Sequence, residues 1–509
     1  MKKIIGIITV VATLGLLLSA CNLDRYPTDR IVNEQAFQTF EDAERFRNGV
    51  YNELRRVRYG IFTTTTELMS DLFNASVGFG GRGAAPHRLY TDFTGATEPR
   101  DIWGNVFGAI AQVNNFINNV EGVTATAEQR EQIADFVAEA HYARAFLYYI
   151  LATHFMYPYS PENRNTPELG MPLLRDFDVT ARPGRATIAE TFAFILEDLE
   201  AAEAISTVGA PRSIRITRDA VHALKARVYF MMGNNARAAH YAEMLIASAR
   251  YPLVRTEEAL RRMWINDDSS EDIFKLQSTQ TATGAFRTNW LSETAAWTLA
   301  TMSIFSTWDN AASRFAPDFL PTQTVIDLYG DGDMRLNVFF SDPETQIVRY
   351  GGIDRPGVRV LHKFPGNPAL FTTPGITNYR HHQRMHRIAE MYLISAEAGR
   401  NLHRLNELRV ARGASELGGF GPDDQYLRDE WVREFVGEGH RIESLRRWGI
   451  GFDGRVPQDP LSVSNYGGGF YTNRHVTPIQ FYRFTLPIPS NDLQTNPNLR
   501  QTPSWVNPQ

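Results

Sequence analysis

Residues 217–250 read TRDAVHALKARVYFMMGNNARAAHYAEMLIASAR, and they predict two amphipathic helices, 217–232 and 236–250. Apolar residues recur in both halves at three- and four-residue steps, which is the spacing of one helical face. The intervening Gly233-Asn234-Asn235 consists of residues typical of turns. The stretch therefore predicts a helical hairpin, and Pro252 marks its end.

Other segments predict further helices of the same kind. Ala226, Tyr229 and Ala238 fall at the spacing of the small and aromatic positions in a tetratricopeptide repeat, and residues 387–400 and 402–412 predict a second hairpin. Residues 128–154 and 188–202 each have a helical apolar face, the second behind a capping-box pair, Thr187 and Glu190. Residues 424–448 predict one further long helix. The fold class is therefore mostly α, with tetratricopeptide-like hairpins.

Four stretches between these helices have a different character. Residues 76–99, 277–319, 341–380 and 456–480 are rich in Gly, Pro, Thr and aromatic residues and show no sustained helical period. Loops this long are usually functional or disordered, and the aromatic content argues against disorder. A helical scaffold that carries long aromatic loops is typical of a recognition protein.

The first residues predict export and lipidation. Lys2 and Lys3 precede an apolar run from residue 4 to residue 18, which is shorter than the ~20 residues that span a bilayer. Leu18-Ser19-Ala20-Cys21 then has the form of a bacterial lipobox, and Cys21 is the only cysteine of the chain. We therefore expect residues 1–20 to be a lipoprotein signal peptide and Cys21 to carry the membrane anchor.

Charge and length limit the remaining possibilities. The formal net charge of −5 gives no reason to expect a nucleic-acid partner. The length of 509 residues exceeds the size at which single cores usually stop growing, so we expect two closely packed halves.

Several separated motifs carry a likeness to a known family. They are, in chain order, Leu23-Asp24-Arg25-Tyr26-Pro27-Thr28, Glu67-Leu68-Met69-Ser70-Asp71, Ala138-Glu139-Ala140-His141-Tyr142-Ala143-Arg144-Ala145, Gly170-Met171-Pro172-Leu173, Ile388-Ala389-Glu390-Met391-Tyr392-Leu393, Glu438-Gly439-His440-Arg441 and Leu486-Pro487-Ile488-Pro489. Together they resemble the SusD/RagB family of outer-membrane nutrient-binding lipoproteins. The segment before Leu405 is shorter than the family usually has, and Glu430-Trp431 stands where the family tends to have Glu-Arg.

The resemblance implies an architecture, a location and a partner. Helical hairpins in residues 21–255 should pack as one unit against an irregular, loop-rich region in residues 256–509 with little strand. The protein should be a lipid-anchored outer-membrane protein on the cell surface, without a cofactor. It should deliver nutrient oligomers to a SusC-like TonB-dependent channel rather than act as an enzyme.

The irregular stretches supply the candidate ligand-binding residues. Oligosaccharides present flat C–H faces flanked by hydroxyl groups, so a site needs exposed aromatic rings beside planar hydrogen-bonding side chains. The residues that fit this description are Asp71, Asn74, Phe79, Arg82, Tyr90, Trp290, Trp297 and Trp308. Glu139 and Arg144 share a helix with core residues, so we expect these two charged side chains to have structural partners.

Two other cargo and activity classes stay open. A peptide could be held by backbone hydrogen bonds and a few pockets in the same architecture, although an oligosaccharide is favoured by the aromatic loops. A surface glycoside hydrolase would need two carboxylates roughly 5 to 9.5 Å apart, which one sequence cannot exclude.

Signals for other chemistry are weak. Gly78-Phe79-Gly80-Gly81-Arg82-Gly83 lacks the strand and helix that frame a phosphate-binding loop. His382, His386 and Glu390 stand at the spacing of one helical face, but Gln383 occupies the position where a zinc protease needs glutamate, so no metal site is expected.

Overall fold

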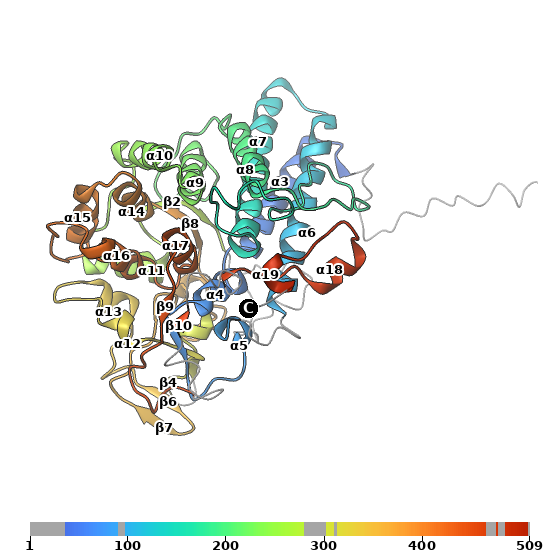
Figure 1. Ribbon diagram of the computed structural model, residues 1–509. Helices are drawn as coiled ribbons and strands as arrows, with labels where there is room; N and C mark the ends of the chain where they lie inside the picture. Colours follow the sequence, from blue (N-terminus) through green and yellow to red (C-terminus); the bar gives the residue numbers. More distant parts are fainter. Residues whose placement is uncertain are drawn as a thin grey trace, which may run out of the picture.

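The computed structural model describes residues 36–89, 97–278, 302–309, 313–464, 475–476 and 484–506. The expected signal peptide, Cys21, Tyr90, Trp290 and Trp297 lie outside the described residues. Figure 1 shows the longest helices in the upper part of the molecule, with short strands both among the helices and at the bottom. The prediction of a mostly helical fold with little strand is therefore confirmed.

Four long helices form the first layer. They are α3 (Phe40–Arg56), α6 (Glu98–Asn119), α7 (Ala127–Phe155) and α8 (Ile188–Ala202). Thr126 and Thr187 begin α7 and α8 with capping boxes, in which the threonine side chain and the third helical residue satisfy each other's backbone N–H groups. The predicted Thr187–Glu190 pair is thus confirmed.

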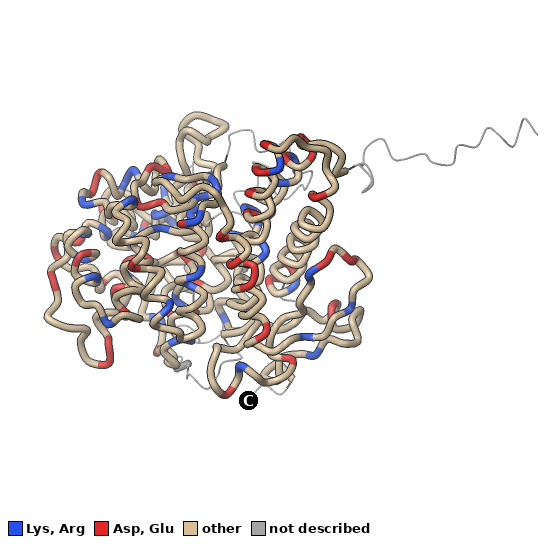
Figure 2. Tube along the Cα trace, turned by 90° about the horizontal axis from the view of Figure 1, so that it is seen from above, with Lys and Arg blue, Asp and Glu red and all other residues tan. Residues whose placement is uncertain are grey.

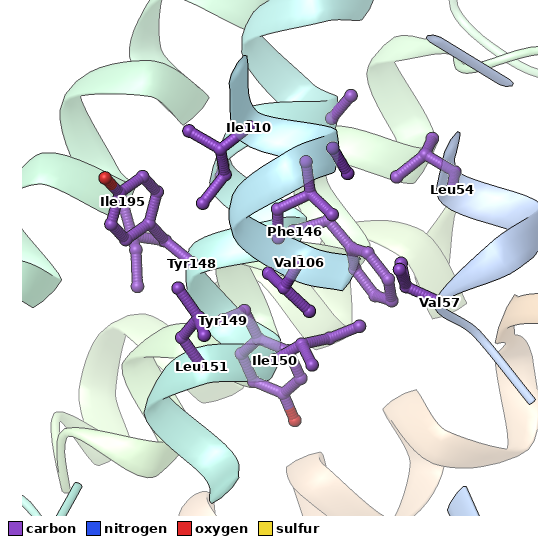
Figure 3. Close-up of a cluster of buried hydrophobic side chains, with 14 of the residues drawn as sticks. Leu54, Val57, Val106, Ile110, Phe146, Tyr148, Tyr149, Ile150, Leu151 and Ile195 are labelled. Carbon is purple, nitrogen blue, oxygen red and sulfur yellow. The ribbon is translucent and has the colours of Figure 1, made fainter. Parts of the chain in front are cut away.

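Helix α7 is the centre of the largest apolar core. Figure 3 shows Phe146, Tyr148, Ile150 and Leu151 of α7 among side chains that come from α3, α6 and α8. The sequence predicted an apolar stripe on one face, but every residue from Tyr142 to Phe155 is buried. The reason is that α3, α6 and α8 pack around α7, so its second half has no solvent face.

The predicted hairpins are present and lie side by side. Helices α9 (Arg218–Met231) and α10 (Asn235–Ala247) form the first, and α14 (Ile388–Ala398) and α15 (Leu402–Ala411) form the second. Gly233 takes a left-handed φ of +68° in the first turn. Ala226 and Ala238 are fully buried, so α9 and α10 approach closely, and α10 packs in turn against α14.

The prediction of one long helix over residues 424–448 is wrong. The structure has α16 (Gln425–Phe435) and α17 (Arg441–Trp448) instead. Gly437 and Gly439, with φ values of +81° and +90°, turn the chain between them. A Cβ at Gly437 would lie 2.8 Å from Leu361 Cδ2, so the turn also needs the missing side chain.

Short elements connect these helices. The described short helices are α4 (Ile61–Met69), α5 (Ala84–His87), α11 (Glu257–Asn266), α12 (Gln323–Ile326), α13 (Arg335–Phe339), α18 (Ser490–Thr495) and α19 (Pro503–Val506), with 3₁₀ turns η1 (Val120–Gly122), η3 (Ser303–Phe305), η4 (Pro368–Leu370) and η5 (Pro422–Asp424). None of the described helices is both long and apolar enough to cross a membrane.

The strands form small sheets that join distant parts of the chain. Antiparallel pairs are formed by β1 (Phe73–Ala75) with β5 (Phe319–Pro321), β2 (Asp272–Leu276) with β8 (Gln383–Arg387), and β9 (Phe452–Asp453) with β10 (His475–Val476). A four-stranded sheet has the order β3 (Trp308–Asp309), β4 (Arg314–Phe315), β6 (Val348–Tyr350), β7 (Ile353–Arg355). Of these pairings, only that of β1 with β5 joins the described strands of the first half to those of the second.

A cluster of buried charges fills the interior between α13, β8, α15 and α16. Glu434, which is fully buried, accepts hydrogen bonds from Arg335, Arg387 and Arg412. Arg412 also binds Glu271, with Nη1–Oε1 and Nη2–Oε2 distances of 2.8 and 2.9 Å. These pairs connect α13, β8 and α16 with the residues that precede β2 and follow α15.

The division of the chain at residue 255 stays a prediction. Side chains from both sides of that position, including Phe146, Phe274 and Ile488, share the first core.

Candidate ligand-binding surface

The first predicted loop leaves strand β1 and anchors on residues 317–319. The Ser76 backbone N–H donates to the Asp318 carbonyl at 2.9 Å, and the Ser76 hydroxyl donates to the Pro317 carbonyl at 2.8 Å. Phe79 is half-buried against Phe319, with ring centroids 5.2 Å apart. Each of these contacts holds the loop against the strand that pairs with β1.

Arg82 extends the same anchoring. Its Nε and Nη2 both donate to Asp318 Oδ2, at 3.0 and 2.7 Å, and the arginine side chain stays 27% exposed. Gly81 and Gly83 have left-handed φ values of +96° and +74°, and a Cβ at Gly78 would overlap the ring of Tyr350. The glycines therefore allow the tight course that places Arg82 on Asp318. The expectation that no strand and helix flank this stretch is wrong, because the short strand β1 precedes it and the four-residue helix α5 follows it.

The second predicted loop contributes Trp308. This half-buried side chain lies on β3 and meets Phe315 edge to face, with ring centroids 4.9 Å apart. Phe315 lies on β4, two residues before Pro317. The structure thus brings Phe79, Arg82 and Trp308 to the same segment, residues 314–319, although the two loops are more than 200 residues apart in the sequence.

Tyr379 is a site residue that the sequence reasoning missed. Its hydroxyl accepts the Trp308 backbone N–H at 2.7 Å and donates to the Ser306 carbonyl at 3.2 Å. Tyr379 is 4% exposed and has a φ of +56°, a conformation that is strained for a bulky side chain. Burial raises the pKa of this hydroxyl, which therefore stays protonated and able to donate. Tyr379 fixes the backbone that presents Trp308.

Asp71 and Asn74 lie on the inner side of this surface. Asp71 accepts from Arg441 Nε and Nη2, at 2.8 and 2.7 Å. Burial raises the pKa of Asp71, but the Arg441 guanidinium outweighs it and holds that pKa below its usual value. Asn74 is 1% exposed and donates its Nδ2 to the Arg455 carbonyl at 2.9 Å. Both residues have partners within the scaffold, and a ligand contact for either stays a prediction.

The remaining predicted ligand-binding residues, Tyr90, Trp290 and Trp297, lie outside the described residues. The expected structural pairing of Glu139 and Arg144 is confirmed, because Glu139 binds Arg47 and Arg215 while Arg144 binds Asp198.

The histidine pattern at residues 382–390 forms no helical face. Residues Gln383–Arg387 are strand β8, and His386 Nε2 lies 2.7 Å from the Tyr142 hydroxyl inside the core. Glu390 binds Arg227. Among the described residues, no three His, Cys, Asp or Glu side chains gather as metal ligands would.

Comparisons with known proteins agree with this architecture. A SusD-like family model described as starch-binding and associating with the outer membrane matches residues 83–230, and the model of the SusD family matches residues 353–505. The two matches together cover more than half of the chain. None of the curated proteins matches it by sequence.

Solved structures resemble the protein over nearly its whole length. A SusD superfamily protein from Bacteroides thetaiotaomicron VPI-5482 is 21% identical, with 91% of this chain and 100% of that chain covered and a TM-score of 0.73. A laminarin-binding SusD-like protein is 19% identical, with 92% and 100% covered and a TM-score of 0.66. The surface glycan-binding protein A from Bacteroides fluxus is 19% identical, with 92% and 99% covered and a TM-score of 0.66. At these identities the likeness establishes the fold.

Proposed function

Because this chain belongs to the SusD/RagB family, we propose that it binds nutrient oligosaccharides at the outer membrane and delivers them to a SusC-like TonB-dependent channel. The observation that carries the proposal is the convergence of two aromatic loops on residues 314–319, with Phe79, Arg82 and Trp308 held there. Two of the structural relatives are named as a laminarin-binding protein and a surface glycan-binding protein.

The chemistry of this surface suits a sugar. The half-exposed rings of Phe79 and Trp308 offer apolar faces for the C–H groups of a pyranose. The guanidinium of Arg82 is oriented by Asp318, and the arginine side chain is 27% exposed near the two rings. Tyr379 removes backbone freedom at Trp308 before the ligand arrives, which lowers the entropy cost of binding.

The location and the delivery step rest on the N-terminal pattern and on the family. Lys2, Lys3 and the lipobox that ends at Cys21 support export and lipid anchoring. The family description associates its members with the outer membrane. A receptor that is held at the outer membrane by a lipid needs a separate channel to move its cargo inward, and a SusC-like protein fills that role in the proposal.

Calorimetric titration of the chain from Asn22 onward tests the binding step, because that chain retains every described residue. The ligands are a panel of neutral oligosaccharides, including laminarin and starch fragments, and a matched panel of peptides. We expect saccharide binding that weakens at least tenfold in Trp308→Ala. Trp505→Ala, which removes a half-buried tryptophan from the C-terminal helix α19, should bind normally.

The other outcomes separate the alternative functions. Peptide binding without saccharide binding would overturn the cargo and leave the carrier role. Shortened saccharide products after prolonged incubation would favour the surface hydrolase. If saccharide binding were unchanged in Trp308→Ala, the binding site would lie elsewhere on the protein.

A further inference from the structure

A cleft of about 680 Å³ lies on the helical scaffold, away from the predicted ligand-binding surface. Its lining comes from the end of α7, the following residues 156–163, and helices α8, α9, α17 and α19. Helices α8, α17 and α19 are labelled in the upper and middle parts of Figure 1, whereas β4, β6 and β7 lie at the bottom. The volume is within the range of small-ligand pockets, roughly 300 to 1,000 Å³.

One wall of the cleft holds an arginine with an unusual set of partners. Arg446 is 6% exposed, and its Nη1 and Nη2 donate to the backbone carbonyls of Thr153 and Met156. Among the described residues no carboxylate lies within ion-pair distance of Arg446, and its Nε has no hydrogen-bond partner. Burial lowers the pKa of Arg446 to about 10, although the nearby Glu443 acts in the opposite direction.

Other buried arginines of this protein are better satisfied. Arg335, Arg387 and Arg412 each bind at least two carboxylates. Arg185 also binds backbone carbonyls instead of carboxylates, but its Nε, Nη1 and Nη2 all donate and together reach four acceptors. Arg446 is therefore a buried cation with spare donor capacity in the wall of a cleft.

Two neighbouring groups compensate the charge only in part. The carbonyls of Thr153 and Met156 belong to the C-terminal end of α7, which carries roughly half a negative charge. Glu443 also lines the cleft, but its carboxylate accepts the Tyr149 hydroxyl at 2.8 Å. Burial raises the pKa of Glu443 despite the nearby Arg227, so its negative charge is itself disfavoured.

Aromatic rings stand at the same cleft. Tyr159 is half-buried and meets Phe192 edge to face, with ring centroids 5.4 Å apart. The Tyr157 hydroxyl accepts the Ser504 backbone N–H at 3.0 Å. Both rings thus line the same cleft as Arg446, and each is held by a contact of its own. This is the combination that a charged sugar requires, with a ring for its C–H face and a guanidinium for its carboxylate.

We propose that the cleft between α7, α8, α17 and α19 is a second saccharide site, which takes a carboxylate-bearing sugar such as a uronate through Arg446 and the rings of Tyr157 and Tyr159. The inference rests on the proposed function for its class of cargo, but it uses none of the residues of the first surface. It extends recognition from neutral oligosaccharides to acidic ones.

Trigalacturonate and its fully methyl-esterified form are the probes, because the ester keeps the sugar rings and removes the charge. Calorimetry at pH 7 with the chain from Asn22 onward should show trigalacturonate binding at least tenfold tighter than the ester. Arg446→Gln should lower the trigalacturonate affinity to that of the ester. Tyr159→Ala should lower the affinity for both trigalacturonate and its ester several-fold.

Two controls keep the test independent of folding and of the first surface. Arg185→Gln removes a buried, carbonyl-bound arginine elsewhere and should leave trigalacturonate binding unchanged, as should Trp308→Ala. If the melting curve of Arg446→Gln shows that this variant is unfolded, the second site is tested by the comparison of acid and ester and by Tyr159→Ala. Equal affinity for acid and ester, no trigalacturonate binding, or a loss caused by Trp308→Ala instead would each overturn the second site. A failure of the proposed function at the first surface would be seen separately, because Trp308→Ala would then leave the binding of neutral sugars unchanged.

Discussion

The core around α7 and the interior around Glu434 are both fully buried, yet they are stabilised by different chemistry. The first is built from side chains such as Phe146, Leu151 and Ile110, which pack without direction-specific bonds (Figure 3). The second is built from Arg335, Arg387, Arg412 and their carboxylate partners. Figure 2 shows positive and negative residues interspersed along the chain, and many of these pair inside it.

The difference has a structural consequence. Apolar packing tolerates exchange between residues of similar size, whereas a buried ion pair needs each partner at a fixed position because an unpaired charge is costly. The charged interior connects Glu271, at the start of β2, with Arg412, at the end of α15, and with Glu434 in α16. The irregular half of the molecule is therefore held in one arrangement by matched charges.

Glu434→Gln should break the charged interior and give the largest effect. It leaves Arg387 and Arg412 each without one of their charged partners in a fully buried site. The free energy of unfolding should fall by about 4 kcal/mol, measured by urea denaturation. Glu197→Gln, at an exposed pair with Arg175, is the control and should change stability little. A Glu434 effect no larger than the control would contradict the account.

Leu151→Ala should open a cavity in the apolar core. Leu151 is fully buried, and truncation should lower the free energy of unfolding by about 3 kcal/mol. The loss should not depend on salt concentration, because no charge is involved. If the loss of unfolding free energy in Leu151→Ala depended strongly on salt concentration, charges would contribute to the apolar core as well, and the contrast between the two regions would be wrong.

Acidification should distinguish the two regions more finely. The pKa of Glu434 lies well below its usual value, because Arg412 and Arg387 outweigh the opposing effect of burial. A depressed carboxyl pKa gives stability that is complete above the unfolded pKa of about 4.5 and is lost as pH falls toward the folded pKa. Wild type should therefore lose stability as the pH falls from about 5 to about 3, and Leu151→Ala should lose as much. A Glu434→Gln variant with an equally steep pH profile would refute this assignment.

Tyr379→Phe should have the smallest effect on stability. The change removes the hydroxyl that accepts from Trp308 N–H and leaves the ring in place. We expect a loss of about 1 kcal/mol in the free energy of unfolding, together with a several-fold weaker affinity for neutral oligosaccharide. An unchanged affinity with the same loss of stability would make Tyr379 a purely structural residue.

Local patterns predicted the helical scaffold well. The apolar period identified α7 and α8, the Thr187 cap marked the start of α8, and the turn at Gly233 identified the α9–α10 hairpin. The apolar period wrongly predicted one helix over residues 424–448, because apolar spacing continues across Gly437 and Gly439 while the backbone turns there. It also suggested a helical face at His382 and His386, where pairing with β2 makes a strand.

Pairings across long sequence distances could not be predicted in this way. Asp71 finds Arg441 and Arg82 finds Asp318 only when the chain has folded, and no local spacing encodes either pair. Composition singled out the two aromatic loops, because Trp308 and Phe79 stand in non-periodic stretches, and their role in recognition stays a prediction. Tyr379 was missed because its role comes from a hydroxyl that reaches across to another loop.

A crystal structure of the protein with the neutral oligosaccharide that binds most tightly is the most direct test of the account. We expect sugar density against Trp308 and Phe79, with a hydroxyl group of the ligand within hydrogen-bond distance of Arg82. Density on a face that none of these three residues reaches, with the residues 314–319 surface empty at saturating ligand, would contradict it.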